Sequence, residues 1–134
     1  MRTVFGIPVT AVLVALGSVT LGSVMLAPLA LRAGEADVVG VEVVRNGERW
    51  RFDVTVKHAD TGWDHYADEW RVVAPDGTVL GTRTLHHPHV NEQPFTRSLS
   101  GVVIPDDLEE VIVQARDSVH GYGGVEMRVA LPRE

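Results

Sequence analysis

Residues 39–56 read VGVEVVRNGERWRFDVTV, and this stretch decides the fold class. Valines alternate with other residues from Val39 to Val43, and apolar residues alternate with polar ones from Trp50 to Val56. A period of two indicates a β-strand with one apolar and one polar face. Asn46-Gly47 lies between the two halves, and Asn-Gly is the strongest short signal for a hairpin turn. The stretch therefore predicts two antiparallel strands joined by a tight turn.

The same strand pattern continues to the end of the chain, separated by turn residues such as Pro75-Asp76-Gly77. Five further strands are expected, over residues 69–72, 79–85, 97–103, 111–115 and 125–131. Seven short strands without a convincing helix predict an all-β fold. We expect a seven-stranded antiparallel β-sandwich, immunoglobulin-like or fibronectin type III-like, with a small closed barrel as the alternative.

An uncharged apolar run, residues 4–31, precedes the strands and is bracketed by Arg2 and Arg32. A basic start followed by an apolar stretch is typical of secretory signal peptides, and the small residues after the run fit a cut before Asp37. The run is also long enough to remain as an anchor, because a membrane-spanning helix needs about 20 apolar residues.

We therefore expect residues 1–36 to form a hydrophobic leader helix, either a cleaved signal peptide or an uncleaved membrane anchor. Residues 37–134 are expected to form one exported β-sandwich domain, periplasmic or extracellular. A membrane contact is expected only through an uncleaved leader.

The composition excludes several classes of function. The 134 residues include no Cys, which excludes disulfides, zinc–thiolate sites, thiol catalysis and a lipid anchor on a lipoprotein cysteine. Asp and Glu number 18 against 12 Lys and Arg, for a net charge of −6. Nucleic-acid binding requires a basic surface, so a nucleic-acid partner is not expected.

The unusual residues gather at one end of the expected sandwich. If consecutive strands alternate in direction, the loops 59–66, 86–95 and 118–124 share one end, which we call the histidine pole. All six histidines fall in or beside these three loops. Loops at one end of a rigid sandwich are where such folds carry binding function.

Metal binding is the sharpest hypothesis for the histidine pole, because imidazole suits copper, zinc, nickel and iron. His87-Pro88-His89 brings two rings close together, and other histidines approach from neighbouring loops. We predict a divalent transition-metal site, with copper or zinc as the candidate ion. The candidate ligands are His58, His86, His87, His89 and His120.

The alternative is a non-catalytic structural or protein-interaction module of the cell envelope, in which the histidines form a hydrogen-bonded structural cluster. Aromatic side chains would then anchor a protein or small organic partner. The candidate binding residues are Trp63, His65, Tyr66, Glu92, Phe95, Asp117 and Tyr122.

Catalysis is not expected, and no catalytic residue is predicted. Asp117, Ser118 and His120 are close in sequence, but a catalytic triad is defined by geometry, and the chain has no Gly-x-Ser-x-Gly nucleophile turn. Paired acidic residues such as Asp64 and Asp68 are better explained as solvated loop residues or as partners of arginines.

Three segments resemble those of a family of small exported bacterial proteins of uncharacterised function. They are HADTGWDHYAD at residues 58–68, HPHVNEQPFTRS at residues 87–98 and ARDSVHGYGG at residues 115–124. The resemblance would cover most of the domain. It implies export and a bacterial source, and it carries over no activity and no catalytic residue.

Overall fold

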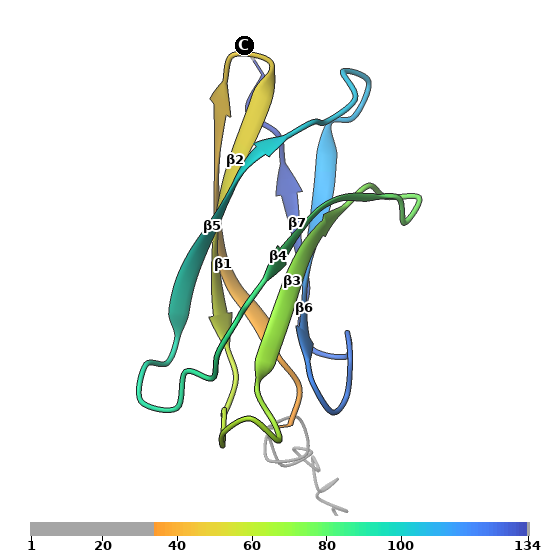
Figure 1. Cartoon of the computed structure of the whole chain (residues 1–134). Helices are drawn as coiled ribbons and strands as arrows, with labels where there is room; N and C mark the ends of the chain where they lie inside the picture. Colours follow the sequence, from red (N-terminus) through yellow and green to blue (C-terminus); the bar gives the residue numbers. More distant parts are fainter. Residues whose placement is uncertain (1–33, 134) are drawn as a thin grey trace, which may run out of the picture.

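The computed structural model describes residues 34–133, which form two stacked antiparallel sheets (Figure 1). The strands are β1 (Asp37–Asn46), β2 (Arg49–Lys57), β3 (Ala67–Val73), β4 (Val79–Thr84), β5 (Phe95–Val102), β6 (Glu110–Asp117) and β7 (Met127–Ala130). One sheet has the order β1-β2-β5 and the other β4-β3-β6-β7. The prediction of an all-β sandwich with seven antiparallel strands is confirmed, while the leader expected over residues 1–36 lies almost wholly outside the described residues.

The first hairpin forms as expected, with its turn displaced by one residue. Asn46 pairs with Arg49, so the two loop residues are Gly47 and Glu48 rather than Asn46 and Gly47. Gly47 has a φ of 64°, a conformation that glycine adopts without a steric penalty. A glycine at the first of two loop positions is typical of the type II′ hairpin turn.

Alternation along β2 builds the core between the two sheets. Trp50, Phe52, Val54 and Val56 are all buried, and the residues between them are partly or fully exposed. They pack against the buried face of the other sheet, where Trp70 is the largest fully buried side chain. The apolar face predicted from the sequence is therefore the face that holds the sheets together.

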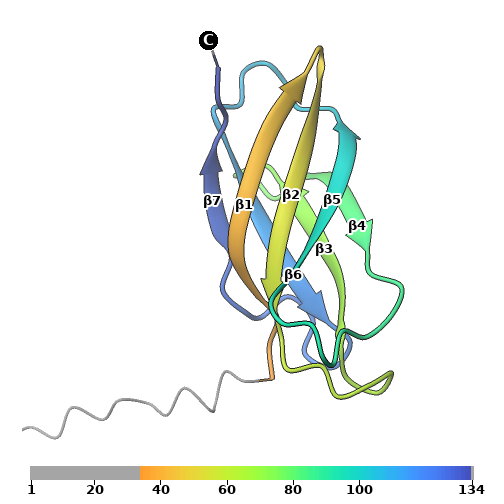
Figure 2. The same ribbon diagram turned by 90° about the vertical axis from the view of Figure 1, so that its left-hand side faces the viewer.

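The alternating strand directions bring three loops to one end of the sandwich (Figures 1 and 2). These are the loops from β2 to β3, from β4 to β5 and from β6 to β7, and together they form the histidine pole. The chain also enters β1 from this end. Over residues 34–133, no helix is long and apolar enough to cross a membrane.

Candidate metal centre at the histidine pole

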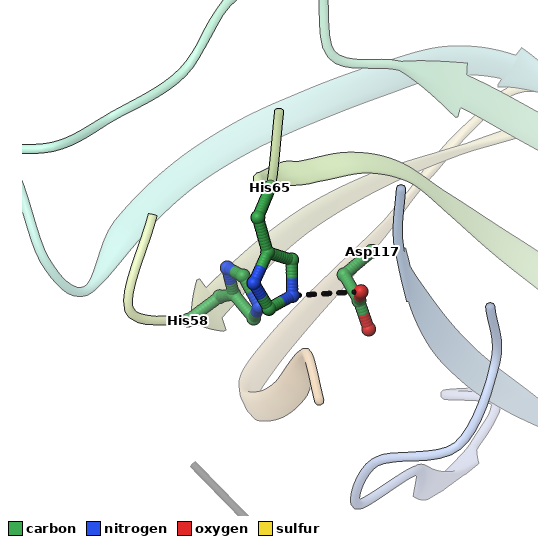
Figure 3. A group of neighbouring side chains, drawn as sticks. All are labelled: His58, His65 and Asp117. Atoms are coloured by element: carbon green, nitrogen blue, oxygen red, sulfur yellow. Dashed lines mark hydrogen bonds and ion pairs between the residues drawn. The ribbon is translucent and has the colours of Figure 1, made fainter. Parts of the chain in front are cut away.

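Two imidazoles and one carboxylate converge where the two sheets meet at the histidine pole (Figure 3). His58 directly follows β2 in the three-stranded sheet, and Asp117 is the last residue of β6 in the four-stranded sheet. His65 lies just before β3 begins. One potential ligand atom from each residue lies within 4.8 Å of those of the other two, and His65 Nε2 is 3.0 Å from Asp117 Oδ1. The site therefore joins the ends of both sheets.

The loop between β2 and β3 turns sharply so that His65 returns to His58. The Thr61 N–H donates to the His65 carbonyl at 3.0 Å, and the His65 N–H donates to the Gly62 carbonyl at 3.2 Å. Gly62 has a φ of 144°, which a residue with a side chain rarely adopts. The two imidazole rings meet edge to face with centroids 4.7 Å apart.

Asp60 holds the site in place through hydrogen bonds of its side chain, which is fully buried. Its Oδ1 accepts hydrogen bonds from His58 Nδ1 at 2.5 Å and from the Ala67 N–H at 2.9 Å. Its Oδ2 accepts a hydrogen bond from the His89 N–H at 2.8 Å. One carboxylate thus ties the end of β2, the start of β3 and the loop before β5 together.

His58 faces a hydrogen-bond acceptor at each ring nitrogen. Nδ1 faces the Asp60 carboxylate, and Nε2 lies 3.1 Å from the carbonyl oxygen of Gly34. A neutral imidazole carries only one N–H. Both contacts are therefore favourable only when the ring is doubly protonated, or when a cation lies beside the Nε2 lone pair.

The side chain of Asp117 is fully buried, and its two carboxylate oxygens differ in their hydrogen bonds. Oδ1 accepts the backbone N–H groups of Val119 and His120 at 2.9 and 2.8 Å, and it also contacts His65 Nε2 and His120 Nδ1, each at 3.0 Å. Within the described part of the chain, Oδ2 is buried and has no hydrogen-bond partner.

The electrostatics of Asp117 keep it charged. Burial raises the pKa of this carboxyl, but the backbone N–H groups of His120 and Val119, together with the His120 ring, outweigh burial and leave the pKa below its usual value. A charged, buried oxygen without a partner is costly, because such groups normally find a hydrogen bond or an ion. Oδ2 is therefore the feature of the site that most needs an additional ligand.

The histidines of the loop from β4 to β5 do not belong to this three-residue group. His89 is buried, its ring stacks on Phe95 with centroids 4.0 Å apart, and its Nε2 accepts a hydrogen bond from Arg97 at 2.8 Å. The His87 ring lies beside His89, at 4.6 Å between centroids, and is exposed to solvent, as is His86. Of the five expected metal ligands, only His58 belongs to the three-residue group, with His120 bound to its carboxylate.

The remaining predicted binding residues are dispersed over the pole. Trp63 is 68% exposed and meets Tyr66 edge to face at 5.7 Å, whereas Phe95 is buried in the core. Glu92 lies 3.5 Å from Arg97. The Tyr122 hydroxyl donates to Glu69, and burial followed by the Glu69 carboxylate raises the pKa of this phenol.

Sequence reasoning placed His65 and Asp117 among binding residues rather than metal ligands, and it missed Asp60 and Gly34. The spacing His58-x-Asp60 was a signal that could have identified the carboxylate, because a histidine ligand commonly donates its second N–H to an acid. Gly34 contributes a backbone oxygen, for which residue type gives no signal.

The lowered pKa of His89 should make the stability of the fold depend on pH. Burial, followed by the positive charges of Arg97 and His87, lowers the pKa of His89, so the folded ring stays neutral where the unfolded ring is protonated. The free energy of unfolding should therefore fall as pH drops below about 6.5, by about 1.4 kcal/mol for each unit of pKa difference. Urea unfolding at pH 7.5 and 5.5 measures this fall. It should shrink in His89→Gln and persist in the control His86→Gln; an equal fall in both would contradict the assignment.

Comparisons with known proteins find a relative in sequence and a solved structure of similar fold. No model of a known protein family matches the chain. A protein of Halomicrobium mukohataei named "Putative lipoprotein" is 44% identical over 96 residues, a match that spans 71% of this chain and 47% of that protein. The chain thus spans about half the length of the curated relative it matches.

Among solved structures, a hypothetical protein from Pyrococcus horikoshii OT3 is similar at a TM-score of 0.52, with 14% identity over 75% of this chain and 92% of that chain. That similarity is one of fold. A superoxide reductase in the oxidised state gives a TM-score of 0.47, with 13% identity over 78% of this chain and 99% of that chain.

Proposed function

We propose that this chain is a non-catalytic, exported β-sandwich module that binds one divalent transition-metal ion through His58, His65 and Asp117. The observation that carries the proposal is the buried, partnerless Oδ2 of Asp117 beside two converging imidazoles, as described for residues 34–133. A bound cation would satisfy this oxygen and neutralise its charge.

The carboxylate that contacts His58 supports the same proposal. Histidines that bind metals almost always donate their other ring N–H to a carboxylate or a carbonyl, which fixes the tautomer and orients the lone pair. Asp60 accepts such a bond from His58 Nδ1, which leaves the Nε2 lone pair of this ring free to bind an ion. Two imidazoles and one carboxylate without a thiolate suit zinc, copper(II), nickel or iron(II). Copper remains one candidate among these ions.

Export and anchoring are part of the proposal. The uncharged residues 4–31 and the name of the Halomicrobium mukohataei relative both support an exported, membrane-associated chain.

We also propose that the sandwich is of the immunoglobulin or fibronectin type III kind. Its sheet orders, β1-β2-β5 and β4-β3-β6-β7, support this because they give the three-plus-four division of strands found in such domains.

Calorimetric titration of the metal-free full chain in detergent with zinc and with copper(II) tests the proposal. One ion per chain should bind with a dissociation constant below about 100 µM, and His58→Ala or His65→Ala should weaken binding by at least about 100-fold, or 2.7 kcal/mol. His87→Ala is the matched control, since its ring is exposed and outside the three-residue group. Its affinity should equal that of the unmodified chain.

Two results would count against metal binding. One is the lack of saturable binding by either ion, and the other is binding that His87→Ala weakens as much as His58→Ala does. The structural alternative would then stand, with the His58 ring held between Asp60 and the Gly34 carbonyl.

A further inference from the structure

We infer, on the basis of the proposed metal site, that the backbone carbonyl oxygen of Gly34 is its fourth protein donor. The site would then be completed by the residues that join the apolar N-terminal segment to the domain.

The spacing of the donor atoms supports this assignment. The Gly34 oxygen lies 3.1 Å from His58 Nε2 and 3.0 Å from His65 Nε2. Donors about 2.1 Å from one ion are separated by about 3.0 Å at right angles and by about 3.4 Å at tetrahedral angles. The observed separations match neighbouring positions around a five- or six-coordinate ion, with two nitrogen and two oxygen donors from the protein.

Packing holds the Gly34 carbonyl in this position. Ala36, two residues later, is fully buried and belongs to the hydrophobic core. The Val38 N–H donates to the Val125 carbonyl at 2.8 Å, and the Val125 N–H donates to the Asp37 carboxylate at 2.7 Å. Residues 34–36 are therefore fixed against the loop from β6 to β7.

Two glycines make this packing possible. A Cβ atom on Gly124 would lie 2.0 Å from the Ala36 carbonyl oxygen, so any side chain there would push the segment away. A Cβ atom on Gly34 would lie 2.6 Å from Cε1 of His120, so the His120 ring packs directly on this residue.

This arrangement couples the metal site to the leader. A cut between Ala36 and Asp37 would remove the carbonyl donor and a core residue together, whereas a chain that keeps residues 34–36 keeps the complete donor set. Metal affinity would then depend on where the leader is processed.

Isotope labelling tests the donor directly in the full chain. The protein is produced with glycine carrying ¹³C at the carbonyl and is loaded with copper(II), and ¹³C electron–nuclear double resonance then detects labelled carbonyls next to the ion. A coupling should appear in the unmodified chain and in His120→Ala. It should disappear in the double variant His120→Ala/Gly34→Ala, because the alanine carbonyl is unlabelled and the missing ring leaves room for its Cβ.

The outcomes separate this inference from the proposed function. Copper binding without a ¹³C coupling, or with a coupling that persists in the double variant, would overturn the role of Gly34 and leave the three-residue site intact. A chain that binds no copper or zinc would overturn both.

Discussion

Replacing Asp60 with alanine should lower the free energy of unfolding by at least about 3 kcal/mol, because three donors lose one buried acceptor. The Asp60 side chain is fully buried and accepts hydrogen bonds from His58 Nδ1, from the Ala67 N–H and from the His89 N–H. The alanine variant leaves three buried donors without an acceptor, and each such donor costs about 1–3 kcal/mol. The loops of the histidine pole should therefore lose their common attachment.

Urea unfolding of the full chain in detergent, followed by tryptophan fluorescence, measures this loss. Asp64→Ala is the matched control, because Asp64 is an exposed acid in the same loop and its removal should change stability by less than about 0.5 kcal/mol. Asp60→Asn should fall between the two variants, because it keeps an acceptor oxygen and loses the charge. Equal stability of Asp60→Ala and Asp64→Ala would show that the hydrogen bonds of Asp60 do not contribute to stability.

The fold could be predicted because its signals are local. The alternation from Trp50 to Val56 specifies a buried face whichever strand it pairs with, and turn residues mark where the chain reverses. The hairpin turn was displaced by one residue because pairing of Asn46 with Arg49 makes the glycine, rather than the asparagine, the first loop residue. The gathering of the histidine loops followed from strand alternation alone.

The site could be predicted only as a region, because its contacts are long-range. The sequence suggested His87 and His89 as a pair of ligands because only Pro88 separates them. In the structure, the Nε2 lone pair of His89 accepts a hydrogen bond from Arg97. Asp60 could not be singled out from the other acids of the loop, because its oxygens accept backbone N–H groups that only tertiary folding brings near. A backbone donor such as Gly34 has no sequence signature.

Replacing Asp117 with asparagine should weaken metal binding by at least about 100-fold, or 2.7 kcal/mol, while lowering the free energy of unfolding by no more than about 1–2 kcal/mol. The substitution removes the charge that a divalent cation would neutralise. The amide oxygen can still accept the Val119 and His120 N–H groups that end β6. The side-chain NH₂ takes the place of Oδ2, which already has no partner among residues 34–133, so one unsatisfied polar group replaces another.

Asp117→Ala is the variant that separates the two roles of this residue, because it removes both the charge and the turn at the end of β6. It should lose metal binding to the same extent as Asp117→Asn and be less stable by a further 1–3 kcal/mol or so, since two backbone N–H groups lose their acceptor. Thermal unfolding with and without zinc provides the second measurement, because an ion that binds only the folded chain raises its stability. Zinc should raise the melting temperature of the unmodified chain and of neither variant. An equal rise in Asp117→Asn would mean that the ion is bound elsewhere, and that the buried oxygen of Asp117 is not a ligand.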